Sequence, residues 1–115
     1  MFATGSATPN DWARALLQKI VPVLNRLPQA ISIAGHTDSA PYRGTERSNW
    51  ELSTERANAT RRALVEATFS PDRIRNITGH ADRDLLLPSD PLAAANRRIA
   101  IVVLHSARTG TTVTR

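Results

Sequence analysis

The sequence AISIAGHTD occupies residues 30–38 and contains both a strand and the turn that follows it. Isoleucines and small residues alternate over residues 30–34, and this period of two predicts a half-buried β-strand. Gly35 then favours a turn. We therefore expect His36 and Asp38 to lie where the chain leaves a sheet, the place at which α/β proteins bind ligands.

An amphipathic helix is predicted before this strand. Large apolar residues recur at three- and four-residue steps between Trp12 and Leu27. Thr8 supplies a capping hydroxyl and Pro9 suits the first helical position. Pro28 ends the pattern, because the residue before a proline disfavours helical backbone angles.

A second helix is predicted after the strand. Residues 39–47 have no periodicity and form a long surface loop, and long loops in compact domains tend to be functional. Residues 48–68 are rich in Ala, Leu, Glu and Arg, which favour helix. Trp50, Ala57 and Leu64 recur every seven residues, so this stripe can face the core.

The remaining sequence adds further strands. Residues 74–78 and 98–105 predict strands, a weak strand is expected near the N-terminus, and residues 91–96 predict one or two helical turns. Helices between strands imply crossovers and some parallel pairing. The sequence therefore predicts an α+β two-layer sandwich, with a small mixed sheet of about four strands and two main helices packed on one face. We place this domain at residues 1–105 and expect a flexible tail at 106–115.

The net charge of +5 comes almost wholly from arginine, because Lys19 is the only lysine among fifteen basic residues. Guanidinium groups recognise carboxylate or phosphate through bidentate hydrogen bonds. Nucleic acid, anionic lipid and an acidic glycopeptide all fit this charge. However, the five aromatic residues do not interleave with the basic ones, so the stacking surfaces of single-strand binders are missing.

The composition is that of an ordinary globular domain, with 41% hydrophobic and 22% charged residues. No cysteine is present, so we expect neither a disulfide nor a thiolate metal site. Apolar runs such as residues 99–104 are far shorter than the roughly 20 residues of a transmembrane helix. Residues 1–6 do not resemble a signal peptide, so we expect any export signal or membrane anchor to lie upstream.

The pattern Gly-His-x-Asp occurs twice, at residues 35–38 and 79–82, each time after a predicted strand. If the two loops converged, they would bring together four side chains that can bind zinc: His36, Asp38, His80 and Asp82. No spacing such as His-x-x-x-His enforces that convergence, and Gly and Asp are common in turns. We therefore favour a structural role for the repeat and expect no metal and no cofactor.

Catalysis has little support in the sequence. A hydrolase would need Ser48 or Ser53 as its nucleophile, but neither lies in a nucleophile-elbow pattern. His36 and Asp38 are two residues apart, so they point to opposite faces of an extended segment and one cannot readily orient the other. We expect a domain without enzyme activity.

A polar face is predicted on the first turns of the second helix. Spacings of three, four and seven residues place one set of side chains on a single stripe: Asn49, Leu52, Ser53 and Arg56. Arg56 projects back toward the helix start, where the macrodipole also favours an anion. The alternative is an ordinary surface ion pair between Arg56 and one of three acids, Glu46, Glu51 or Glu55.

Three motifs in register resemble the OmpA-like family of peptidoglycan-binding domains. They are ISIAGHTD at residues 31–38, NWELSTERA at residues 49–57 and NRRI at residues 96–99. Their order and spacing match the family from about residue 2 to residue 104. Within the family, the insertion at residues 40–44 and SNWELS at residues 48–53 resemble the wall-anchoring B subunits of flagellar stators.

The resemblance implies non-covalent binding of peptidoglycan that carries diaminopimelate in its stem peptide. The end of that side chain holds an ammonium and a carboxylate on one carbon, so Asp38 would hold the ammonium and Arg56 the carboxylate. Asn49, Leu52, Asn96 and Arg97 would line the groove, and backbone N–H groups near Thr37 would add hydrogen bonds. The site implied by the family comprises Thr37, Asp38, Asn49, Leu52, Ser53, Arg56, Asn96 and Arg97.

The resemblance also implies partners and a location. Stator B subunits act as homodimers beside an ion-conducting partner subunit, to which an upstream membrane segment would connect this domain, and the domain itself would be periplasmic. A wall-anchoring domain of an outer-membrane lipoprotein or porin is an open alternative. A nucleic-acid-binding module is disfavoured, because the basic residues are scattered among acidic ones, and we expect no nucleic-acid partner.

Overall fold

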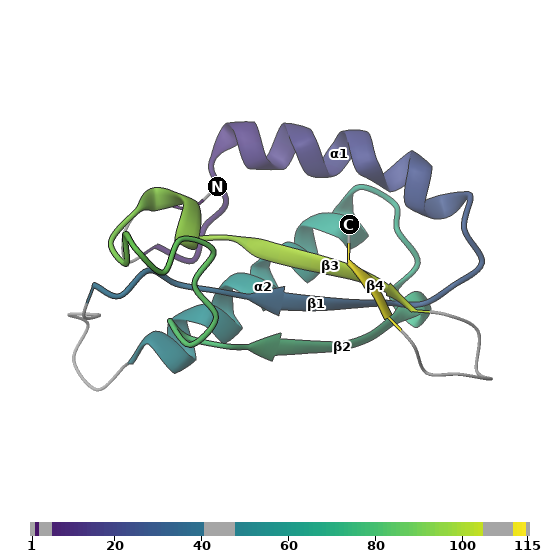
Figure 1. The fold of residues 1–115 in the computed structure, drawn as a ribbon. Coiled ribbons are helices and arrows are strands. Elements are labelled where there is room, and N and C mark those ends of the chain that lie inside the picture. The colour runs from purple at the N-terminus through teal and green to yellow at the C-terminus, as the bar shows by residue number, and fades with distance from the viewer. Residues whose placement is uncertain (1, 3–5, 41–47, 105–111, 115) are drawn as a thin grey trace.

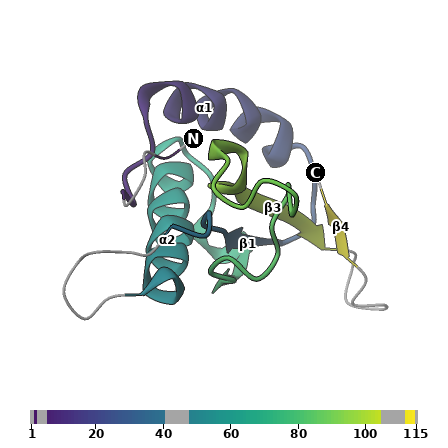
Figure 2. The same cartoon turned by 60° about the vertical axis from the view of Figure 1, so that its left-hand side comes forward.

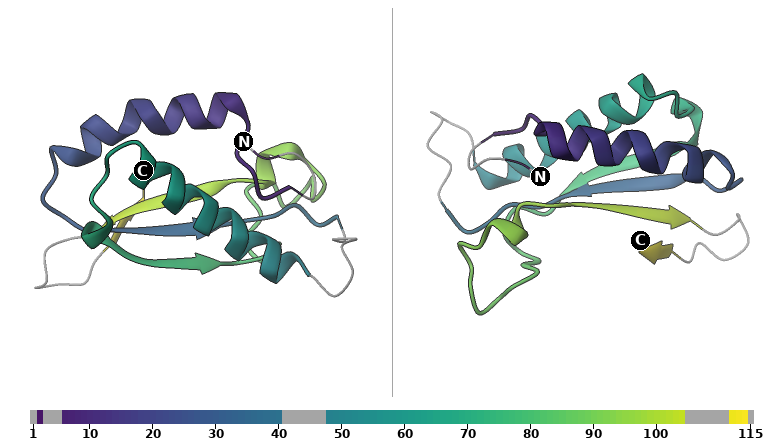
Figure 3. Two further views of the ribbon diagram at one scale, coloured as in Figure 1. Left: turned by 180° about the vertical axis from the view of Figure 1, so that it is seen from behind. Right: turned by 90° about the horizontal axis from the view of Figure 1, so that it is seen from above.

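The computed structural model describes residues 2, 6–40, 48–104 and 112–114 of the chain. Two helices, α1 (Asp11–Asn25) and α2 (Asn49–Glu66), cover one face of a mixed sheet (Figures 1 and 3). This arrangement confirms the predicted α+β two-layer sandwich. Among the described residues, neither helix is long and apolar enough to cross a lipid bilayer.

The strand predicted first from the sequence, β1 (Ile31–Gly35), lies inside the sheet. It pairs in parallel with β2 (Ile74–Gly79) and antiparallel with β3 (Ile99–Leu104). A short strand, β4 (Thr112–Thr114), pairs antiparallel with β3, so the order is β2-β1-β3-β4. Figure 2 shows β4 at the outer edge beside β3. The parallel pairing of β1 with β2 requires a crossover connection, and α2 supplies it.

The fourth strand is not the one that the sequence predicted. Phe2, from the predicted N-terminal strand, forms an isolated bridge with Pro9, and residues 3–5 lie outside the described part of the chain. Residues 112–114, which the sequence placed in the tail, form β4 instead. Residues 106–111 and 115 are not described, so the flexibility of that part of the tail stays a prediction.

The first helix begins two residues later than predicted. Asn10, not Thr8, caps α1, because the Asn10 side chain accepts a hydrogen bond of 2.8 Å from the Ala13 N–H. The buried face of α1 also differs from the apolar stripe that the sequence predicted, since Trp12, the first residue of that stripe, is 65% exposed. The side chains that α1 buries are Ala13, Leu17, Val21 and Leu24.

The second helix agrees closely with the sequence. Ser48 and Glu51 form a capping box at the start of α2, and most of the predicted loop before it lies outside the described residues. Ala57 and Leu64 face the core as predicted, but Trp50 is 49% exposed, so its assignment to the core stripe was wrong. Past the end of α2, Thr68 adopts a left-handed backbone with φ of 75°.

The core lies between the sheet and the two helices. Ile31 and Ile33 are fully buried on β1, in keeping with the alternation seen in the sequence. The buried cluster contains Leu17, Val21, Leu24, Ile31, Ile33, Ala57, Leu64, Phe69 and Val103. The remaining elements are short 3₁₀ turns, η1 (Pro71–Arg73) and η2 (Ala94–Asn96), the second of which falls within the helical turns predicted at residues 91–96.

Candidate functional site

The two Gly-His-x-Asp loops lie side by side at the carboxyl ends of β1 and β2, next to the first turn of α2 (Figure 1). Gly35 and Gly79 are paired in the register of the parallel strands. The loops are joined by backbone hydrogen bonds from the His80 N–H to the Gly35 carbonyl, 3.0 Å, and from the Thr37 N–H to the Ala81 carbonyl, 2.9 Å. The repeat therefore builds one end of the sheet, as the sequence predicted.

Both glycines are required because α2 packs directly against them. A Cβ atom on Gly35 would lie 2.0 Å from the Ser53 carbonyl oxygen, and one on Gly79 would lie 2.5 Å from the Ser53 hydroxyl. That hydroxyl donates to the Trp50 carbonyl at 2.9 Å and accepts from the Ala81 N–H at 3.0 Å. Ser53 is fully buried, and its hydroxyl connects the start of α2 to the second loop.

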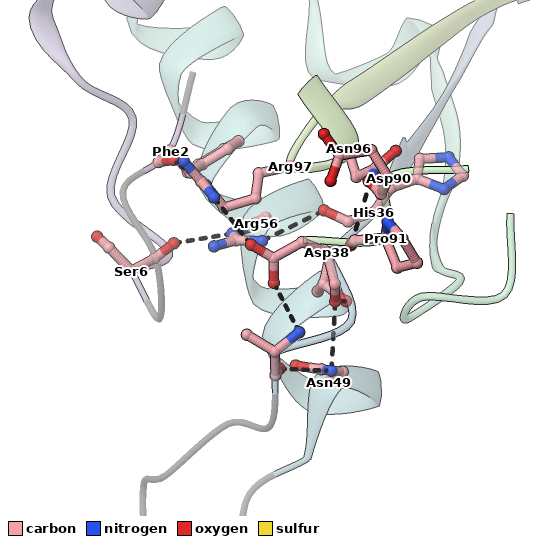
Figure 4. Close-up of polar contacts among 12 residues, drawn as sticks. Phe2, Ser6, His36, Asp38, Asn49, Arg56, Asp90, Pro91, Asn96 and Arg97 are labelled. Atoms are coloured by element: carbon pink, nitrogen blue, oxygen red, sulfur yellow. Dashed lines mark hydrogen bonds and ion pairs between the residues drawn. The ribbon is translucent and has the colours of Figure 1, made fainter. Parts of the chain in front are cut away.

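Asp38 forms an ion pair with Arg97 (Figure 4). The Asp38 Oδ2 atom lies 2.8 Å from Arg97 Nη1, while Oδ1 accepts a hydrogen bond of 3.1 Å from the Ala40 N–H. Arg97 also donates through Nε to the Phe2 carbonyl at 2.8 Å. The two side chains are only 7% and 15% exposed, so this is a largely desolvated pair.

Arg56 lies on α2 and bonds to the backbone of two other segments. It is fully buried, and it donates from Nε to the Ser6 carbonyl at 2.8 Å and from Nη1 to the His36 carbonyl at 3.3 Å (Figure 4). Its guanidinium also lies 5.1 Å from the centre of the Phe2 ring. The guanidinium paired with Asp38 is that of Arg97. The predicted division of a ligand's two charges between Asp38 and Arg56 stays a prediction.

Three other predicted site residues stabilise the loops. Asn49 donates from Nδ2 to the Ala40 carbonyl at 3.1 Å, which ties α2 to the loop after β1. Asn96 is fully buried, and its amide group accepts from the Leu87 N–H at 2.8 Å and donates to the Asp90 carbonyl at 2.9 Å. The Thr37 hydroxyl donates to the Asp38 carbonyl at 2.8 Å.

The last predicted site residue, Leu52, is 3% exposed. In this structure it offers a ligand almost no surface. The structure does bring Asp38, Asn49 and Arg97 together, because Arg97 pairs with the Asp38 carboxylate and Asn49 reaches the Asp38 and Ala40 carbonyls.

The histidines of the repeat stack on each other. The ring centres of His36 and His80 are 4.9 Å apart, with an angle of 10° between the planes. Burial, together with the positive charges of Arg98 and His80, lowers the pKa of His36 to about 4, whereas Asp84 opposes the shift. Burial also lowers the pKa of the Arg98 guanidinium. The His36 ring is therefore neutral at pH 7.

The predicted alternative of a zinc site finds no support here. Asp38 is occupied by Arg97, and His80 Nδ1 lies 3.4 Å from Asp84 Oδ2. In the part of the chain that the structure describes, no three His, Cys, Asp or Glu side chains gather closely enough to hold a metal ion.

One stabilising contact was missed entirely in the sequence. Arg73 donates through Nη2 to the Leu24 carbonyl at 2.9 Å and the Gln29 carbonyl at 2.8 Å, at the C-terminal end of α1. It also lies over the Phe69 ring, 4.8 Å from its centre. No local pattern points to this contact, because it joins residues more than forty positions apart.

Comparison with known proteins identifies the class to which this fold and site belong. Residues 1–98 match the model of the OmpA family, so the chain belongs to that family. It is 44% identical to motility protein B of Escherichia coli K12 over 107 residues, which cover 91% of this chain. The same match covers 35% of that protein, so the chain spans about a third of its length.

Solved structures agree with this class. The C-terminal domain of Helicobacter pylori MotB has a TM-score of 0.81 at 20% identity and covers 93% of this chain and 84% of its own, so the likeness shows the fold. The cell wall anchor of the T6SS from Pseudomonas aeruginosa has a TM-score of 0.74 at 28% identity, over 90% of this chain and 73% of its own.

Proposed function

We propose that this domain binds peptidoglycan non-covalently and anchors a flagellar motor stator to the cell wall. Membership of the OmpA family and the similarity to motility protein B support this role. The observation that carries it is the desolvated pair of Asp38 and Arg97, because it offers one negative and one positive group side by side. The domain would act in the periplasm without catalysing a reaction.

The ligand would be the zwitterionic end of a diaminopimelate side chain. Its ammonium would replace the Arg97 guanidinium at Asp38, and its carboxylate would be taken up by the displaced Arg97. Each charge of the ligand thereby meets an opposite charge, so no buried charge is left without a partner. A ligand end with only one of the two charges would leave Asp38 or Arg97 unsatisfied.

Arg56 is the other candidate for the ligand's carboxylate. It is fully buried and contacts Phe2 and Ser6, so a direct contact with a ligand requires these contacts to open. Without that opening Arg56 supports the site through the His36 carbonyl, two residues before Asp38. Thr37, Asn49, Leu52, Ser53 and Asn96 would then shape the groove and hold its loops.

We further propose that the domain works as a homodimer whose upstream membrane segment meets a MotA-like channel subunit. An apolar groove of about 360 Å³ runs between α1 and β3, lined by residues that include Leu16, Val23 and Ile101. Covering it with a second copy would remove apolar surface from water. Light scattering of the domain and of a Leu16→Glu, Val23→Glu variant tests this arrangement.

The experiment that tests the proposed function is binding to purified peptidoglycan sacculi with free diaminopimelate as competitor. The wild-type domain should sediment with the sacculi, and diaminopimelate should release it. Asp38→Asn and Arg97→Ala should each remove binding, since losing one member of a desolvated charge pair costs about 2 to 5 kcal/mol. The exposed residues Asp72 and Arg75 supply matched controls, Asp72→Asn and Arg75→Ala. Retention of Asp38→Asn at the wild-type level would exclude this site.

A wall-anchoring domain of a lipoprotein or porin would bind sacculi equally well. The sequence that precedes this domain in its natural protein would distinguish a stator subunit from a lipoprotein or porin, because only the stator subunit needs a membrane helix there. Electrophoretic mobility shifts with duplex DNA test the nucleic-acid alternative, whose affinity should fall steeply with salt.

A further inference from the structure

A shallow groove of about 550 Å³ lies along the outer side of α2 beside β2. Its lining residues are Trp50, Glu51, Thr54, Glu55, Asn58 and Ile77. Trp50 is 49% exposed there, although a tryptophan on the first turn of a helix could pack inward. Arg83, in the second loop, makes a cation–π contact with its ring, since the guanidinium carbon lies 5.8 Å from the ring centre. The groove thus has an exposed aromatic surface with a positioned ring.

The chemistry of this lining is amphipathic. Trp50 and Ile77 supply apolar surface, whereas Thr54, Glu55 and Asn58 supply a hydroxyl, a carboxylate and an amide around it. A pyranose ring has the matching pattern, with C–H groups on its faces and hydroxyl or acetamido groups along its edge. Aromatic side chains offer large apolar contact area, and carboxylates accept strong hydrogen bonds from hydroxyls.

The groove and the site proposed above both involve the first turn of α2. Trp50 directly follows Asn49, whose side chain reaches the Ala40 carbonyl in the Asp38 loop. Ser53, one turn further along α2, connects the Trp50 carbonyl to the Ala81 N–H of the second loop. In peptidoglycan, each stem peptide is joined covalently to an amino sugar of the glycan strand. A stem peptide at Asp38 therefore brings its own glycan close to the start of α2.

We infer that the Trp50 groove is a subsite for the glycan strand of peptidoglycan, with an N-acetylated sugar ring stacked on Trp50. This inference rests on the proposed function, since it concerns the same polymer. The two subsites together would bind a disaccharide-peptide more tightly than either part, because the second contact forms within one ligand. Trp50 would therefore make the domain bind intact peptidoglycan more tightly than a free stem peptide.

Calorimetry with two soluble ligands tests the inference: a disaccharide-tetrapeptide and the same tetrapeptide without sugar. The wild-type domain should bind the first about tenfold more tightly, a difference of about 1.4 kcal/mol. Trp50→Ala should bind both ligands with the affinity that the wild type has for the bare peptide, and Trp50→Phe should keep part of the gain. Trp12→Ala is the matched control, since Trp12 is 65% exposed on α1 and should leave the gain unchanged.

Equal affinity of the wild type for both ligands, or a full gain in Trp50→Ala, would overturn the inference. If the wild type binds neither ligand, the proposed function fails, and a second measurement still decides the groove. Trp12→Phe leaves Trp50 as the only tryptophan, so its fluorescence reports the groove alone. Oligomers of N-acetylglucosamine should shift that fluorescence. No change up to about 10 mM sugar would mean a binding free energy weaker than about −3 kcal/mol, and this result would exclude the subsite.

Discussion

The carboxylate of Asp38 and the guanidinium of Arg97 lie 2.8 Å apart, although 59 positions separate them in the chain. Asp38 follows β1 and Arg97 precedes β3, so the antiparallel pairing of these strands brings the two residues together. Both side chains are shielded from water. Each charge is therefore tolerated because the other is present.

The first prediction concerns the energetic coupling of this pair. Asp38→Asn and Arg97→Gln should each lower the free energy of unfolding by about 3 kcal/mol, because each leaves a buried charge without its partner. The double variant should lose clearly less than the sum. Urea denaturation of the four proteins measures the coupling. Asp72→Asn and Arg75→Gln, both at exposed positions, should each cost less than about 0.5 kcal/mol. Strictly additive losses would contradict the pairing.

The sequence predicted where Asp38 and Asn49 lie in the fold, but not the contacts that they make. Asp38 and Asn49 were placed correctly at the end of β1 and the start of α2, since strand alternation and helix capping are local patterns. The partner of Asp38 was not predictable, because two arginines, Arg56 and Arg97, fit the same chemistry. Burial of Arg56 by the N-terminal segment distinguishes them, and burial of that kind depends on contacts distant in sequence.

The second prediction concerns the two glycines under α2. Gly35→Ala should destabilise the fold by about 3 kcal/mol, since its Cβ would lie 2.0 Å from the backbone oxygen of Ser53, which cannot rotate away. Gly79→Ala should cost less, because its two nearest contacts, at 2.2 and 2.5 Å, are side-chain hydroxyls and its closest backbone contact, the Thr54 nitrogen, lies at 2.7 Å instead of 2.0 Å. Thermal denaturation ranks the two variants. A Gly35→Ala protein as stable as wild type would show that α2 does not pack this closely.

The third prediction concerns the residue after α2. Thr68 has φ of 75°, and its N–H and that of Phe69 bond to the Val65 and Leu64 carbonyls in a Schellman motif. A β-branched residue is strained in this conformation, so Thr68→Gly should stabilise the domain by about 0.5 to 1 kcal/mol. Ala67→Gly, one residue earlier at φ of −86°, should instead destabilise it. Chemical denaturation measures both changes, and a loss of stability in Thr68→Gly would contradict the strain.

The fold was predictable to the extent that its elements are local. Periodicity and residue composition identified both helices and the strands β1, β2 and β3. It could not identify β4, because Thr112 and Thr114 flank a single apolar residue and the strand forms only by pairing with β3. The apolar stripe of α1 was misplaced because Trp12 and Val23 extend the helical pattern although they are exposed.

The fourth prediction concerns stability in acid. His36 has a pKa near 4 in the folded protein, against about 6.5 in the unfolded chain, because burial and the nearby Arg98 disfavour its charged form. Between these values the unfolded chain binds the proton first, so folding stability falls as the pH falls. The contribution is fully present above about pH 6.5 and is lost by about pH 4, with a size of about 2 to 3 kcal/mol.

Urea denaturation of the wild type and His36→Gln between pH 4 and pH 8 measures this loss. The wild type should lose about 2 to 3 kcal/mol more than the variant over that range, since other carboxylates and histidines titrate in both proteins. His80→Gln is the control: it removes one neighbouring positive charge but leaves His36 buried, so most of the acid sensitivity should remain. Parallel pH profiles for wild type and His36→Gln would show that the stacked, buried ring does not resist protonation, and the neutral His36 assigned to the folded site would then be wrong.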